Sequence, residues 1–320
     1  MKHTEIAIDP FAASVAPEPA PAPDAGPPLR PHGAPAGRPS LSLARHLVYV
    51  LKSNPMTLVA SVLFVVMLLA AVFGPVLAPY NPLKSEAAAA LQPPSFSHWF
   101  GTDDLGRDVF SRVLVATRLD LTIALAAVAI SFVLGSIVGS LAGYYGGWID
   151  KITGRIIDTI MAFPLFVLAM GIVAALGNSV ENIVYATAIV NLPFYARMAR
   201  AEVNVRRDAG FVQAAKLSGN TDLRALATQI FPNALPPMMV QISLNLGWAI
   251  LNAAGLSFIG LGVNPPTPEW GIMVAEGARF IVSGEWWLAL LPGAVLMLAV
   301  FTFNMLGDGL RDLVDPRQRT

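Results

Sequence analysis

Cysteine is absent from this sequence, and charged residues are scarce, at 13% of the 320 residues. The lack of cysteine excludes disulfides, thiolate metal sites and cysteine nucleophiles. The formal net charge is zero, which argues against a nucleic-acid-binding protein because such proteins carry an excess of basic residues. No phosphate loop of the form GxxxxGKS or GxxxxGKT occurs, so the sequence shows no ATP-binding motif of its own.

Apolar residues make up 55% of the chain and form long runs without charge. A helix needs about 20 consecutive apolar residues to cross a bilayer, and its backbone groups are satisfied within the helix. The sequence therefore predicts an all-α integral membrane protein with six transmembrane helices, placed at residues 56–73, 121–149, 159–180, 182–196, 237–260 and 286–306. The fourth run is short, and we expect Arg197 and Arg200 to lengthen it by extending their side chains to the interface.

Basic residues are distributed unevenly between the two sets of loops. Sixteen of the 21 Lys and Arg residues fall on the side that holds both termini, and the other five are Lys84, Arg107, Arg112, Arg118 and Arg279. Loops rich in Lys and Arg remain in the cytoplasm. The sequence therefore predicts cytoplasmic N- and C-termini, together with a cytoplasmic location for the long polar insertion that follows residue 200.

Four segments are expected along the chain. Residues 1–44 are rich in Pro and Ala and are predicted to be a disordered cytoplasmic tail, because such a composition buries too little apolar surface to order itself. Residues 45–118 hold the first transmembrane helix and an external segment. Residues 119–310 form a core domain with five transmembrane helices and a cytoplasmic loop at 201–236, and residues 311–320 form a cytoplasmic tail.

Ionisable residues are nearly absent from the middle of the predicted spans, and Asp158 lies next to the start of the third. Carboxylates or histidines near the bilayer midplane mark proton- and ion-coupled carriers, so a secondary transporter is disfavoured. A membrane-bound hydrolase is disfavoured as well, because the sequence shows no charged dyad, metal-ligand cluster or His-rich helix.

The insertion at 201–236 is predicted to contain a bent helical hairpin. A short helix at 212–217 ends at Gly219, a residue type that terminates helices in the left-handed conformation. A second helix starts with Thr221 or Asp222 as its N-cap and ends before Pro232. The residues alone leave two interpretations open, a hairpin that presents small side chains to a partner or an ordinary amphipathic helix at the membrane interface.

The hairpin resembles the cytoplasmic loop of ABC importer permeases. That loop has the pattern Glu-Ala-Ala, three residues, Gly, and a Leu-Pro about a dozen residues later; Gln213 stands here in place of Glu, and Phe231 in place of Leu. By this resemblance the ATPase-coupling residues are Gln213, Ala214, Ala215, Lys216, Gly219, Asp222 and Pro232.

Further segments resemble the dipeptide, oligopeptide and nickel branch of these permeases. They are residues 98–112, 142–148 and 304–317. The signature residues in the first are Gly101, Thr102, Asp103, Gly106, Arg107 and Asp108. Apart from the resemblance, this segment reads as a helix start capped by Asp103 or Asp104. A ridge formed by Gly135, Gly139 and Gly143 is typical of close helix packing.

The resemblance implies the type I permease fold of ABC importers and a place in a bacterial cytoplasmic (inner) membrane. It implies a related second permease subunit, two ATPase subunits that bind ATP and Mg, and an external solute-binding protein. The chain itself is expected to bind no cofactor or metal and to have no catalytic residue. Peptides or peptide-like solutes are the expected cargo. The alternatives are nickel or another small solute, or a stand-alone channel or secondary transporter.

Overall fold

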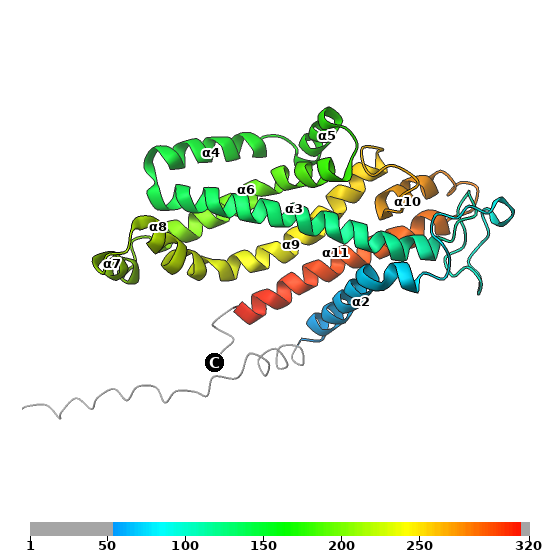
Figure 1. Ribbon diagram of the computed structural model, residues 1–320, viewed down its shortest axis with the longest axis horizontal. Coiled ribbons are helices and arrows are strands. Elements are labelled where there is room, and N and C mark those ends of the chain that lie inside the picture. The colour runs from blue at the N-terminus through cyan, green and yellow to red at the C-terminus, as the bar shows by residue number, and fades with distance from the viewer. Residues whose placement is uncertain (1–53, 315–320) are drawn as a thin grey trace, which may run out of the picture. The chain divides into compact units, whose positions relative to one another are not determined.

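The computed structural model describes residues 54–314, and within that range the regular elements are helices and no strand is formed (Figure 1). The long helices are α2 (Pro55–Leu77), α3 (Val109–Tyr145), α4 (Gly147–Met161), α5 (Leu165–Leu176), α6 (Val180–Arg206), α9 (Phe231–Phe258) and α11 (Trp287–Val314). The short ones are η1 (Ala87–Ala89), α7 (Gly210–Leu217), α8 (Asp222–Ala225), the π-helical η2 (Leu226–Ile230) and α10 (Trp270–Ala278). The predicted tail at 1–44 and residues 315–320 of the predicted C-terminal tail lie outside the described residues.

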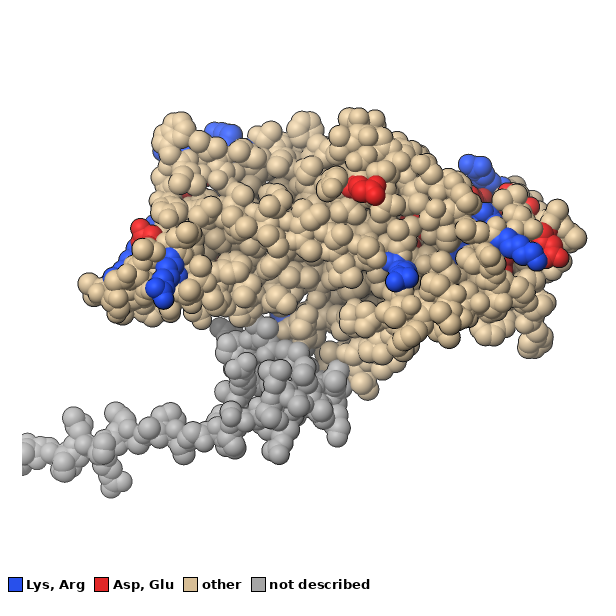
Figure 2. Space-filling model, viewed as in Figure 1, with Lys and Arg blue, Asp and Glu red and all other residues tan. Residues whose placement is uncertain are grey.

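Four helical segments are long and apolar enough to cross a membrane: α2, α3, the continuous stretch 222–258 and residues 287–311. The bent pair of α4 and α5 raises the number to as many as five. On the face shown in Figure 2, charged side chains gather at the two ends of the helices, and few interrupt the belt between them. This distribution fits a protein whose middle lies in lipid.

Helices α3, α6 and α9 form the centre of the bundle, and α3 makes its most extensive contact with α6 (Figure 1). The predicted glycine ridge lies in this contact. A Cβ atom added to Gly135 would lie 2.8 Å from the Leu192 carbonyl oxygen, and one added to Gly143 would lie 2.5 Å from the Arg200 carbonyl oxygen. The ridge therefore serves close helix packing, as its spacing predicts.

The second predicted span, 121–149, starts too late in the chain. Helix α3 begins at Val109 and has Asp108 as its N-cap, so the predicted domain boundary at 118/119 falls inside it. The prediction started the span after the last charged residue, Asp120, but Arg112 and Asp120 are both buried within the helix. Their side chains have polar partners from other segments, so charge does not mark the end of this helix.

The third predicted span, 159–180, is not one helix. The chain breaks between α4 and α5, which meet at 88°. Pro164 is the N-cap residue of α5; it lacks an N–H and disfavours helical geometry at the preceding Phe163. The span was predicted from a run of uncharged residues, and such a run does not reveal a break in the helix.

The fourth predicted span, 182–196, is the centre of a longer helix, since α6 has 27 residues. The two arginines that were expected to reach the interface bind carboxylates of α4. Arg197 Nη2 lies 3.2 Å from Asp158 Oδ1, and Arg200 Nη2 lies 2.7 Å from Asp150 Oδ2. These ion pairs stabilise the part of α6 that follows its apolar residues.

The second helix of the predicted hairpin does not end before Pro232. Helix α8 continues through η2 into α9, so residues 222–258 are one helical stretch. Pro232 comes two residues after the π-helical turn η2, where the regular hydrogen-bond ladder is already interrupted, so its missing N–H does not end the helix. The fifth span was therefore predicted to start too late, at residue 237, whereas the sixth was placed within one residue of the start of α11.

Candidate functional site

In the hairpin formed by α7 and α8, the first helix, α7, ends at Gly219 in a well-defined cap. This glycine has φ of +88°, the Gly219 N–H bonds the Lys216 carbonyl at 2.9 Å, and the Asn220 N–H bonds the Ala215 carbonyl at 3.1 Å. This is the Schellman arrangement, which requires a left-handed residue at that position. The predicted helix end is confirmed.

The second arm of the hairpin starts at Thr221, one of the two predicted N-caps. Its Oγ1 accepts a hydrogen bond from the Arg224 backbone N–H at 3.4 Å. Asp222, the other candidate, lies in the first turn of α8, and its carboxylate is engaged with side chains outside α8.

A three-residue polar network fixes the hairpin to the end of α3. The Tyr144 hydroxyl donates to Asp222 Oδ1 at 2.7 Å, and Lys216 Nζ lies 3.0 Å from the same oxygen. Lys216 Nζ also lies 5.1 Å from the centre of the Tyr144 ring. The hydrogen bond to Tyr144, followed by that to Asp222, raises the pKa of Lys216, so the ammonium is charged at neutral pH. The sequence interpretation missed Tyr144, although it stands in one of the motifs.

An apolar cluster supports the same junction. Val212 of α7 is fully buried against Val203 of α6 and Ile230 of η2, in a cluster that also contains Tyr144. Two adjacent elements and the end of α3 therefore hold the hairpin at its base.

The exposed face of the hairpin carries two large apolar side chains that were not predicted. Ala214 is exposed and Ala215 is half-buried, but Leu217 is 90% exposed and Phe211 is 44% exposed. Gln213 is exposed, and its Nε2 donates to the Asp208 carbonyl at 3.2 Å. The expected small-residue face is thus bordered by two large apolar side chains, which water solvates poorly.

At the opposite end of α3, the signature segment 101–108 forms a compact loop around Asp103. This carboxylate accepts hydrogen bonds from the Leu105 and Arg107 backbone N–H groups, at 3.0 and 2.9 Å, and from Arg107 Nε at 2.7 Å. Gly106 has φ of +73° and lies against the backbone of Glu86. Only glycine combines that conformation with so close an approach.

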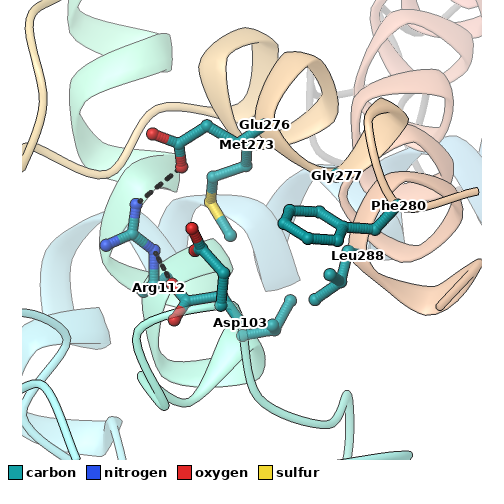
Figure 3. Close-up of a pocket in the computed structure, with 9 residues that line it drawn as sticks. Asp103, Arg112, Met273, Glu276, Gly277, Phe280 and Leu288 are labelled. Carbon is teal, nitrogen blue, oxygen red and sulfur yellow. Dashed lines mark ion pairs between the residues drawn. The ribbon is translucent and has the colours of Figure 1, made fainter. Parts of the chain in front are cut away.

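The loop is joined to α10 by a buried ion cluster (Figure 3). Arg112 lies between Asp103 and Glu276, with nitrogen–oxygen distances of 3.6 and 3.7 Å, and Arg107 lies 3.8 Å from Glu276. Arg112 is 2% exposed. A buried cation requires such partners, so the signature residues brace the end of the bundle.

Asp108, rather than Asp103 or Asp104, caps α3. Its Oδ2 accepts from the Ser111 backbone N–H at 2.8 Å, and its Oδ1 lies 2.9 Å from His98 Nδ1. Thr102 is fully buried, and its carbonyl accepts from Trp287 Nε1 at 3.5 Å. Gly101 packs against the same indole ring. The signature residues thus share one structural unit, but the predicted cap was placed at the wrong aspartate.

Two further buried carboxylates, Asp120 and Glu269, were not identified from the sequence. Glu269 is fully buried and caps α10 by accepting from the Gly271 and Ile272 N–H groups, at 2.9 and 2.8 Å. Asp120 accepts from the Trp270 N–H at 3.2 Å. Burial raises the pKa of Glu269. Within residues 54–314, no group of three or more carboxylate or His side chains is arranged to hold a metal.

The sequence matches two protein families over most of its length. Residues 135–320 match the family described as binding-protein-dependent transport system inner membrane component. Residues 42–94 match the N-terminal TM domain of oligopeptide transport permease C.

Similar proteins cover nearly the whole chain. The "Probable D,D-dipeptide transport system permease protein DdpC" of Escherichia coli is 46% identical over 85% of this chain and 91% of its own length. The dipeptide transport system permease protein DppC of Alkalihalophilus pseudofirmus is 43% identical, over 84% and 88%. The di/tripeptide transport system permease protein DppC of Pseudomonas aeruginosa is 40% identical, over 89% and 97%. This chain therefore belongs to the binding-protein-dependent transport system inner membrane components and is a multi-pass protein of a bacterial inner membrane.

Proposed function

We propose that this chain is the permease subunit of an ABC importer and forms, with a second permease, the path for peptides or peptide-like solutes into the cytoplasm. Three similar permeases are named for dipeptides or di- and tripeptides, and this supports peptides over nickel. The relatives belong to transport systems, which supports a multi-subunit importer over a stand-alone channel or secondary carrier.

The chain crosses the membrane six times in this proposal, through α2, α3, the α4–α5 pair, α6, the stretch 222–258 and α11. Helix α6 lacks the apolar composition of the others, but its 27 residues span about 40 Å and pack along α3. An even number of crossings leaves both termini on the side of the α7–α8 hairpin. The excess of Lys and Arg supports the cytoplasm as that side.

The α7–α8 hairpin, residues Gly210 to Ala225, is the ATPase-coupling element in this proposal. The observation that carries it is the junction of Tyr144, Asp222 and Lys216, which ties the hairpin to α3. A displacement of the hairpin is then transmitted to α3 and, through the glycine ridge, to α6. Rocking of packed helices as rigid bodies is the motion that alternating access needs.

The exposed apolar side chains give the hairpin a surface for a partner. Leu217 and Phe211 project from a short helix that is anchored at its base by Val212. A groove on an ATPase subunit accepts such a helix by burying its apolar side chains. ATP and Mg belong to two partner ATPase subunits, and an external binding protein delivers the solute, so this chain needs no catalytic residue.

The proposal is tested by bulky substitutions in the hairpin at positions outside the contacts that hold its base. Gly219→Val places a β-branched residue at φ of +88° and distorts the end of α7. Ala215→Trp enlarges the surface beside Gln213. Both variants are expected to insert into the membrane at wild-type levels but to lose peptide uptake and co-purification of the ATPase.

The matched control is Gly154→Val in α4, where a Cβ atom meets nothing within 4 Å and the glycine has no positive φ. This variant is expected to retain uptake and ATPase binding. Normal uptake by both hairpin variants would contradict the coupling role, whereas ATPase-independent uptake by the wild-type chain would contradict the importer class.

A further inference from the structure

A polar pocket lies between the end of α3, the start of α4 and the last turns of α6. Its volume is about 270 Å³, and its polar lining is Asp150, Arg197, Arg200, Asn204 and Arg207. Gly143 and Gly146 also line it. Neither the coupling hairpin nor the signature loop contributes to this pocket.

The lining offers more hydrogen-bond donors than its own acceptors use. A guanidinium has five N–H donors, and Arg197 spends one of them on Asp158, whose side chain is 67% exposed. Arg207 bonds the Gly143 carbonyl at 3.3 Å and Asp208 at 3.3 Å. Within residues 54–314, no hydrogen bond involves the side chain of Asn204. Exposed single-contact ion pairs of this kind are weak, so Arg197 and Arg207 are available to a ligand.

The charge of the lining is positive. The one carboxylate among the lining residues, Asp150, binds Arg200 through two contacts, whereas the carboxylate partners of Arg197 and Arg207 lie outside the lining. Two guanidinium groups and a free amide around a space of this size suit a phosphate group, which accepts several charge-assisted hydrogen bonds at once.

The neighbouring surface of α4 indicates that this phosphate belongs to a lipid. Trp148 is 78% exposed, and Ile149, Ile152 and Ile156 are each about half exposed, on the helix that contributes Asp150 to the pocket. Where the α4–α5 pair crosses the membrane, such exposed apolar side chains lie among acyl chains. A phospholipid that places its phosphate in the pocket can cover those side chains with its tails.

We infer that this pocket binds the headgroup of an anionic phospholipid. Basic pockets between membrane helices recognise such headgroups, and the net positive lining favours phosphatidylglycerol over a zwitterionic lipid. The bound lipid bridges α4 to α6 beside the base of the hairpin. The inference rests on the proposed topology only in that this end of α3 lies at a bilayer surface.

The test measures lipid retention on the transporter, purified with its partner subunits, by native mass spectrometry. Phosphatidylglycerol, phosphatidylcholine and inorganic phosphate are added separately. The wild type is expected to retain phosphatidylglycerol through delipidation and to raise its apparent Tm with this lipid alone. Arg197→Gln/Arg207→Gln is expected to bind it at least about tenfold more weakly, because charge-assisted contacts are removed.

Two further variants keep the test decisive. Lys151→Gln/Arg155→Gln removes two exposed charges from α4 that do not line the pocket and is expected to retain the lipid like the wild type. Arg197→Lys/Arg207→Lys keeps the charge and is expected to restore part of the binding, which separates lost recognition from misfolding.

Four results would overturn the inference: equal retention by the glutamine variant of the pocket, equal loss in the α4 control, displacement of the lipid by inorganic phosphate, or loss of a partner subunit from the pocket variant. The last would make the pocket a protein interface. The orientation of the hairpin is measured separately by labelling, and lipid retention does not depend on uptake, so a failure here is distinguishable from a failure of the proposed importer.

Discussion

The hydroxyl of Tyr144 lies 2.7 Å from Asp222 Oδ1, although the two residues are 78 positions apart in the chain. Tyr144 is the penultimate residue of α3, and Asp222 is the first residue of α8. Lys216 binds the same carboxylate oxygen from α7. The contact thus joins the central helix of the bundle to both arms of the hairpin.

Tyr144→Phe removes only the hydroxyl that makes this contact. The buried ring stays, so the chain is expected to fold and insert, while Asp222 and Lys216 lose their link to α3. Hydrogen–deuterium exchange should become faster across 210–225, and peptide uptake should fall at an unchanged level of bound ATPase.

The control for this variant is Tyr145→Phe, because Tyr145 is the next residue and is exposed. It should leave exchange and uptake as in the wild type. If Tyr144→Phe shows the same exchange rates as Tyr145→Phe, the polar junction does not stiffen the hairpin.

Gly139→Leu tests the helix contact that carries motion from α3 to α6. A Cβ atom at this position would lie 2.8 Å from Ala196 Cα, and backbone atoms do not yield as a flexible side chain does. Overpacking should reduce the free energy of unfolding by about 1–3 kcal/mol or more. A clear drop in apparent Tm in detergent is expected, whereas Gly171→Leu, in open space on α5, should have little effect.

Arg112→Met tests the ion cluster beneath the signature loop. The change removes a buried cation and leaves Asp103 and Glu276 without one of their partners. Breaking a buried charge cluster costs about 3–5 kcal/mol, and limited proteolysis should cut the loop at 101–108 sooner. Arg118→Met removes an exposed arginine from the same helix; an equal effect of both changes would show that the cluster contributes nothing special.

Glu269→Gln tests the buried carboxylate at the start of α10, which faces Asp120. Burial raises the pKa of Glu269 above 4.5, its ordinary value. Between that value and the raised pKa, the folded state holds a proton that the unfolded state has lost, so the free energy of unfolding falls as pH rises. Thermal unfolding from pH 4.5 upward should therefore show a shallower decline for Glu269→Gln than for the wild type. The exposed control Glu86→Gln should follow the wild type, and identical slopes in all three proteins would count against the assignment.

Local signals in the sequence were sufficient where the structure is decided locally. The end of α7 at Gly219 and the cap at Thr221 follow from backbone geometry and from a hydroxyl at the right offset. The spacing of Gly135, Gly139 and Gly143 predicted their packing face, because a four-residue period lies along one side of a helix.

Long-range contacts decided the remaining features, and no local pattern contains them. Arg112 and Asp120 are in a helix because Glu276 and Trp270, some 150 residues later, satisfy them. The roles of Tyr144 and Arg200 likewise depend on partners in distant segments. Sequence reasoning treats each such residue as a boundary or a loop charge, since its partner is known only after the helices are packed.

The central claim is that the α7–α8 hairpin faces the compartment in which ATP is hydrolysed. The natural chain has no cysteine, so a single Leu217→Cys at a 90% exposed position, and Phe96→Cys on the opposite segment, report the side of each site without background. With the ATPase subunits left out, a membrane-impermeant maleimide should label the residue-217 variant in inverted vesicles only and the residue-96 variant in intact cells only. Labelling of the residue-217 variant in intact cells would contradict the account.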